Sequence, residues 1–108
     1  MYAEFVAQRF KELETDVETW LHAAVGIAGE SGELLDAIKK AWIYGKELDA
    51  ENVKEELGDI LFYVQAMANQ FGWTVTDLKE HNMAKLIKRY PLGYSDQAAI
   101  NRADKTQS

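Results

Sequence analysis

Apolar residues recur every three or four positions along most of the chain, the spacing of a helix with one buried face. Over residues 2–14 this rhythm predicts an amphipathic opening helix. The strongest rhythm follows Asp49 and predicts a buried helical face, formed by Val53, Leu57, Ile60, Leu61, Val64, Met67 and Phe71. A further series between Thr76 and Tyr90 predicts another helix. Together these patterns predict an all-α fold, a bundle of four to five helices.

The longest predicted helix is marked by its start and by its glycines. Thr15 followed by Glu18 has the form of a capping box, so the helix should begin near Asp16 and continue to about Trp42. Three glycines interrupt it along one strip: Gly26, Gly29 and Gly32. Each costs about 1 kcal/mol relative to alanine in a helix interior. Two explanations stay open, a close crossing with another helix and access for a ligand.

The ends of the later helices are marked by capping and breaking residues. Asp49 should cap the third helix, and Gly72 is placed to end it. Thr76 should cap the fourth helix, which must stop before Pro91 because proline cannot continue a helix. Beyond Pro91 the chain becomes polar, and we expect a surface loop followed by a frayed tail.

Length and composition limit the size and the partners of the protein. A chain of 108 residues favours a single domain, here expected over residues 1–95, with a partly ordered polar tail over 96–108. The formal net charge of −6 argues against binding to nucleic acid or to an anionic membrane. The absence of cysteine excludes disulfides and thiolate metal sites. With no apolar run of about 18 residues and no signal-peptide pattern, a cytoplasmic location is expected.

Two pairs of acids stand out inside the apolar helices. Glu30 and Glu33 occur in "ESGE", and Glu56 and Asp59 occur in "ELGD". Residues three apart share a helix face, so four carboxylates would converge if the two helices pack side by side. A hard divalent cation such as Mg²⁺ would relieve their repulsion. The alternative, that the acids are ordinary residues of a solvated helix face, stays open.

The histidines help to choose among metals. A carboxylate-bridged di-iron bundle would show Glu-x-x-His on two helices. Neither His22 nor His81 follows a candidate acid at that spacing. Magnesium is therefore favoured, with Mn²⁺ as a possible substitute.

A basic stripe lies on the fourth predicted helix. Asn82, Lys85 and Arg89 share one face and present an amide, an ammonium and a guanidinium, which suit phosphate oxygens. Basic residues late in a helix also complement its dipole, so a purely structural role is the alternative.

Three stretches together carry a resemblance to a known family: "GESGELLDAIKKAW", "EELGDILFY" and "NMAKLIKRYP". They resemble the MazG-like nucleoside triphosphate pyrophosphohydrolases, an all-α superfamily marked by ExxE, a spacer and ExxD. The resemblance covers roughly residues 20–103. ExxE alone is uninformative, whereas both acid pairs with the later NxxK and RYP are jointly specific.

The resemblance implies hydrolysis between the α and β phosphates of a nucleoside triphosphate. It implies four Mg²⁺ ligands: Glu30, Glu33, Glu56 and Asp59. It places Asn82 and Lys85 on the nucleotide phosphates, with Arg89 and Lys39 as further candidates. The catalytic base is not fixed, and Glu33 and Glu55 are both candidates.

Three side chains are candidates for contacts to the nucleotide base: His22, Trp20 and Trp42. Rings of this kind can stack on a base, although aromatic residues at helical positions more often belong to a core. His22 is favoured among them because it lies about two turns before Glu30 on a nearby helix face.

Assembly and function follow as expectations. The family forms dimers or dimers of dimers, and the chain carries more large apolar side chains than a bundle of this length can cover. We expect a homodimer or homotetramer that removes deoxynucleotides or non-standard nucleotides from the nucleotide pool. The alternatives are a non-catalytic helical assembly or regulatory module, and an enzyme acting on another phosphoanhydride metabolite.

Overall fold

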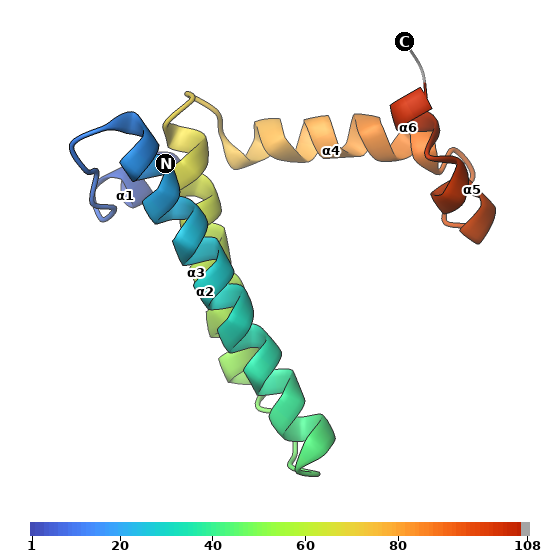
Figure 1. Ribbon diagram of the computed structural model, residues 1–108, viewed down its shortest axis with the longest axis horizontal. Helices are drawn as coiled ribbons and strands as arrows, with labels where there is room; N and C mark the ends of the chain where they lie inside the picture. The colour runs from blue at the N-terminus through green and yellow to red at the C-terminus, as the bar shows by residue number, and fades with distance from the viewer. Residues whose placement is uncertain (107–108) are drawn as a thin grey trace. The chain divides into compact units, whose positions relative to one another are not determined.

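The computed structural model describes residues 1–106, and this part of the chain is helical without strands (Figure 1). The helices are α1 (Tyr2–Ala7), α2 (Asp16–Ile43), α3 (Ala50–Asn69), α4 (Val75–Arg89), α5 (Asp96–Asn101) and α6 (Ala103–Thr106). The predicted all-α class is therefore confirmed. The chain divides into two compact units, the first over residues 1–74 and the second beginning at Val75.

The long helices α2 and α3 form an antiparallel hairpin in the first unit (Figure 1). The Thr15 hydroxyl accepts a hydrogen bond from the Glu18 backbone N–H (3.2 Å) and donates one to the Glu18 carboxylate (2.8 Å). The Asp49 carboxylate accepts from the Asn52 N–H (3.1 Å). Both predicted caps are confirmed, because they satisfy amides that have no partner inside the helix.

Gly72 ends α3 as predicted. It adopts the left-handed backbone conformation, and two backbone hydrogen bonds run back to carbonyls near the end of the helix. Its φ is +74°. The N–H of Trp73 donates to the carbonyl of Ala68 (3.0 Å), and the N–H of Gly72 donates to that of Asn69 (3.3 Å). This is the Schellman arrangement, which favours glycine because a Cβ is disfavoured at positive φ.

The predicted opening helix over 2–14 is wrong in its length, since α1 stops near the middle of that range. The residues after it bond to α2 instead of continuing the helix. The N–H of Leu13 donates to the Thr19 hydroxyl (2.9 Å), and the Nδ1–H of His22 donates to the carbonyl of Lys11 (2.9 Å). These tertiary hydrogen bonds replace the local ones that further helical turns would have formed.

A small polar and apolar core joins α1 to α3. Val6 is fully buried, and Gln65 is 1% exposed. The Gln65 amide donates to the Asn69 side chain (2.8 Å) and to the carbonyl of Trp73 (3.2 Å). The Asn69 amide in turn donates to the carbonyl of Ala3 (3.0 Å). This network satisfies buried polar groups and ties the N-terminal helix to the end of α3.

Much of the hairpin's apolar surface is left uncovered by the rest of the first unit. Large apolar side chains of α2 and α3 lie exposed, including Val17, Leu21, Val25, Leu35, Trp42 and Leu57. Trp42 is the most exposed of these at 80%. None of the helices in the described residues is long and apolar enough to cross a membrane.

In the second unit, α4 begins at Val75, one residue before the predicted cap Thr76, so that prediction is wrong by a small shift. Thr74 stands at the position before the helix. Asp77 lies in the first turn, where a negative charge is favourable beside the positive end of the helix dipole. The helix ends at Arg89, as expected from Pro91.

The predicted polar loop and tail after Pro91 are wrong over most of their length, because α5 and α6 form there. The Ser95 hydroxyl caps α5 by accepting from the N–H of Ala98 (3.1 Å). Asp104 of α6 forms an ion pair with Arg89 of α4, with Nε and Oδ1 2.8 Å apart. Local capping and this ion pair order a segment whose apolar pattern is weak. The predicted frayed end, at residues 107–108, lies outside the described residues.

Candidate metal centre

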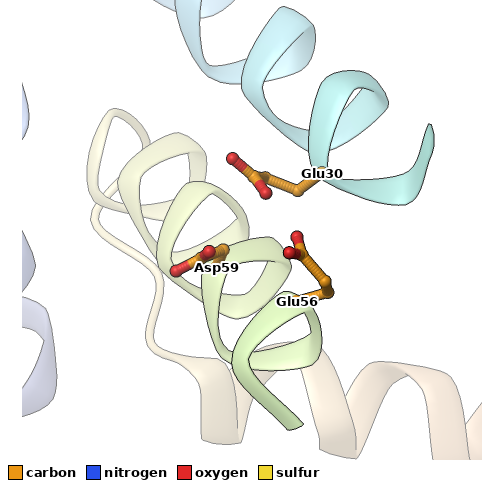
Figure 2. Close-up of side chains that lie close together, drawn as sticks. All are labelled: Glu30, Glu56 and Asp59. Atoms are coloured by element: carbon orange, nitrogen blue, oxygen red, sulfur yellow. The ribbon is translucent and has the colours of Figure 1, made fainter. Parts of the chain in front are cut away.

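Three carboxylates meet between the two helices of the hairpin (Figure 2). Glu30 projects from α2, while Glu56 and Asp59 project from α3. Each offers an oxygen, and these oxygens all lie within 4.8 Å of one another. Glu30 and Glu56 are half-buried, and Asp59 is exposed. The hairpin therefore gathers three negative charges at a site open on one side.

The register of the hairpin explains why these acids face one another. A Cβ added to Gly26 would overlap the ring of Tyr63, so this glycine allows the two helices to approach closely. Glu30 lies one turn after Gly26 and shares its helix face. Glu56 lies about two turns before Tyr63 and shares the face of that residue. The close crossing at Gly26 thus fixes the position of the carboxylates.

The other two glycines of the strip behave differently. A Cβ at Gly29 or Gly32 would have no atom within 4 Å other than its immediate surroundings in the helix. The close-crossing explanation therefore applies to Gly26 alone. The two later glycines leave the helix surface beside Glu30 open.

The electrostatics of the cluster centre on Glu56. Its pKa is raised from 4.5 to about 7, chiefly by a hydrogen bond shared with Glu30 and by burial, and then by the charges of Glu30, Asp59 and Glu33. Its Oε2 atom is buried and has no hydrogen-bond partner in the described part of the chain. A buried carboxylate oxygen without a partner is costly, so the cluster lacks positive charge or donors.

A hard divalent cation fits this donor set. The three side chains offer oxygen ligands only, which Mg²⁺ and Mn²⁺ prefer. Coordination to Glu56 would satisfy the Oε2 atom that the chain leaves unpartnered. Magnesium retains several waters and commonly shares its coordination with substrate phosphates, so three protein ligands are sufficient.

Glu33, the fourth predicted ligand, is not part of this cluster. It is exposed, although its charge contributes to the raised pKa of Glu56. Three residues along a helix correspond to a net rotation of about 60° and a rise of about 4.5 Å, so Glu33 projects from α2 at a different angle and height from Glu30. Glu55 is also exposed and is not among the groups that shift the pKa of Glu56.

Comparison with known proteins identifies the family. The model of the MazG nucleotide pyrophosphohydrolase domain matches residues 18–93, which include every member of the carboxylate cluster. The chain belongs to the MazG family. It is also similar to the "Gene 37 protein" of Mycobacterium phage L5, with 28% identity over 91 residues that cover 80% of this chain and 79% of that protein. No solved structure shows a significant match.

Two predicted base-binding residues of the MazG domain are engaged in packing. The ring of His22 stacks on Phe10 with centroids 4.6 Å apart, and its Nδ1–H is bonded to the carbonyl of Lys11. Trp20 stacks on Phe71 at 5.4 Å. These contacts hold the N-terminal segment and the end of α3 in place.

The remaining candidates on α2 of the MazG domain are solvent-exposed. Trp42 lies near the end of the helix, beyond the carboxylates, with its side chain in solvent. Lys39 is exposed as well, and its neighbour Lys40 pairs with Asp36 at 3.1 Å. Neither Trp42 nor Lys39 belongs to the carboxylate cluster.

The other three predicted phosphate-binding residues lie on α4, in the second unit. Asn82 is exposed and Lys85 is half-buried. Arg89 donates from Nε to Oδ1 of Asp104 (2.8 Å) and from Nη2 to Oδ2 (3.1 Å). These bonds lower the pKa of Asp104 and engage one edge of the guanidinium, formed by Nε and Nη2. The sequence reading missed Asp104, because a single acid in a polar segment has no periodic signal.

Proposed function

We propose that this MazG domain hydrolyses nucleoside and deoxynucleoside triphosphates to a nucleoside monophosphate and pyrophosphate, with Mg²⁺ as cofactor and Mn²⁺ as a substitute. Family membership supports pyrophosphohydrolase activity in general. The observation that supports a metal-dependent reaction is the buried Oε2 atom of Glu56, which has no hydrogen-bond partner in the described residues and lies among converging carboxylates. Such a group calls for a cation, and a cation is what a triphosphate needs for binding.

In the proposed reaction, the oxygen of a water molecule bonds to the α phosphorus while the bond from that phosphorus to the α–β bridging oxygen breaks. The bridging oxygen leaves with the electron pair as part of pyrophosphate, and the water proton passes to a base. Glu30, Glu56 and Asp59 would hold the cation, which supplies positive charge to neutralise phosphate oxygens. Asn82 and Lys85 would donate hydrogen bonds to the phosphates.

Glu33 is the better candidate for the base. It lies close enough to the cluster for its charge to raise the pKa of Glu56, yet it is not one of the converging ligands. Its exposure leaves it free to accept a proton from water and release it to solvent. Glu55 shows no such electrostatic link to Glu56.

We also propose that the domain works as a homodimer or homotetramer in the cytoplasm, where it would remove unwanted nucleotides from the pool. The support for assembly is the uncovered apolar surface of the hairpin, with Leu35 at 69% and Val17 at 66% exposed. Exposed apolar surface of this kind is typical of protein interfaces. Association with a second copy would remove it from water.

A product assay tests the proposed activity. The protein is incubated with Mg²⁺ and a panel of canonical, deoxy and modified triphosphates, and the products are separated by chromatography. We expect monophosphate and pyrophosphate in equal amounts. Diphosphate with orthophosphate would contradict the assigned bond, and no turnover of any triphosphate would contradict the activity.

A further inference from the structure

A hollow of about 280 Å³ lies between α4 and α6 in the second unit. Its walls are formed by His81, Ala84, Lys85, Lys88, Asp104 and Lys105. The α4 members follow the spacing of a single helix face. This face differs from the stripe predicted from sequence, and the two share only Lys85. Lys105 and Asp104 lie beyond the end of the family match at residue 93.

The hollow is strongly cationic within an acidic protein. Lys85, Lys88 and Lys105 place three ammonium groups around it, in a chain whose formal net charge is −6. The carboxylate of Asp104 does not cancel them, because both of its oxygens accept hydrogen bonds from Arg89. No ion pair joins Lys85 or Lys88 to an acid within residues 1–106.

The size and donors of the hollow point to a small anion with several charges. Pockets for drug-sized ligands occupy roughly 300–1,000 Å³, so this hollow is at the lower limit and does not suit a whole nucleotide. Lysine ammonium groups bind phosphate oxygens as compact point charges. His81 adds a ring N–H, which is present in either neutral tautomer and in the charged form.

We propose that this hollow binds a diphosphate group, with Lys88 and Lys105 as ligands in addition to Lys85. The proposal rests on the proposed function, which supplies two sources of this chemistry, the terminal two phosphates of the substrate and the free pyrophosphate product. Arg89 acts indirectly, since it holds Asp104 and with it the α6 wall of the hollow.

Calorimetric titration of the full chain with inorganic pyrophosphate in metal-free buffer tests the binding. Because exposed charge pairs contribute modestly, replacing both lysines, K88Q with K105Q, should weaken binding about 10-fold. The matched control replaces two exposed lysines of the first unit, K46Q with K54Q, and should leave the affinity unchanged. Added salt should weaken binding to the wild type. No binding to the wild type, or equal affinity in both double variants, would overturn the proposal.

Steady-state kinetics separate the two sources of the diphosphate. If the substrate's terminal phosphates occupy the hollow, K88Q with K105Q raises KM about 10-fold. If only free product binds there, KM is unchanged and inhibition by pyrophosphate weakens by the same factor. If the wild type binds pyrophosphate but hydrolyses no triphosphate, the proposed function is contradicted. If it hydrolyses triphosphates fully but does not bind pyrophosphate, only the proposal that the hollow binds a diphosphate group is contradicted.

Discussion

Two neighbouring stretches of the α2–α3 hairpin have opposite chemistry. At Gly26 the helices touch, and the ring of Tyr63 fills the space that a Cβ would need. One turn later, Glu30 faces Glu56, like charges meet, and a buried oxygen is left without a partner. At the first stretch the side chains of the hairpin fill the contact between the helices, whereas at the second no positive charge of the cluster balances the carboxylates. This difference indicates that the first is a structural frame and the second is a site for a ligand.

The largest expected effect comes from removing the central charge of the site. Glu56→Gln should lower kcat/KM for triphosphate hydrolysis by about 100- to 1,000-fold, because it weakens the hold on the cation that would neutralise the phosphate oxygens. The melting temperature of the metal-free variant should not fall, because the substitution removes repulsion from Glu30 and Asp59.

The matched control for Glu56→Gln is Glu51→Gln, an exposed acid in the first turn of the same helix. This control should retain nearly full activity. Equal loss in both variants, measured as initial rates with circular dichroism to check helicity, would remove the cluster from the mechanism.

A single added methyl group should disrupt the close crossing of α2 and α3 at Gly26. Gly26→Ala should destabilise the protein by about 1–3 kcal/mol, because the new Cβ overlaps the Tyr63 ring and the helices must separate. Gly29→Ala, where the added Cβ meets open space, should instead stabilise the helix by about 0.5–1 kcal/mol. Urea denaturation measures both variants, and effects of the same sign would contradict the assigned crossing.

In the second unit the buried carboxylate of Asp104 is paired with Arg89, unlike the carboxylates of the cluster. Asp104→Asn should lower the melting temperature, because the Asp104 side chain is only 3% exposed and Arg89 would lose its partner. The comparison pair is Lys40–Asp36, whose side chains are 58% and 50% exposed. Asp36→Asn should change the melting temperature much less, since exposed ion pairs contribute little. The reverse ranking in calorimetry would contradict the assigned roles.

The smallest expected effect is a dependence of stability on pH. The folded metal-free protein keeps a proton on Glu56 up to a pKa of about 7, whereas the unfolded chain releases it near 4.5. The folded state therefore binds more protons in this window, so its stability should fall as pH rises from about 4.5 through about 7. Thermal melts of Glu56→Gln should show a shallower fall than those of wild type, and parallel curves would contradict the raised pKa.

The hairpin shows how much the sequence could predict. Thr15, Asp49 and Gly72 act on their immediate neighbours, so their capping roles follow from local rules and are confirmed. The pairing of Glu30 with Glu56 and Asp59 also has a local part, the spacing of acids on a helix face. These acids meet because α2 and α3 pack side by side, and the apolar faces of the two helices predicted that packing.

The parts that sequence could not predict depend on contacts between distant residues. The opening helix stops early because Lys11 and Leu13 bond to α2, and no local pattern encodes those partners. The C-terminal helices depend on Arg89 meeting Asp104, fifteen positions away. Glu33 satisfied the same spacing rule as Glu30, but it is not among the carboxylates that converge, because the spacing along one helix does not say which of its acids lies opposite Glu56 and Asp59.

Metal binding by the wild type and by Glu56→Gln is the decisive test of the carboxylate cluster as a cation site. Calorimetric titration with Mg²⁺ near pH 7, in buffers of different ionisation enthalpy, reports both affinity and proton release. Wild type should bind Mg²⁺ and release a proton from Glu56, and the variant should lose both the affinity and the proton release. Equal affinity and equal proton release in the two proteins would contradict a cation site at the cluster.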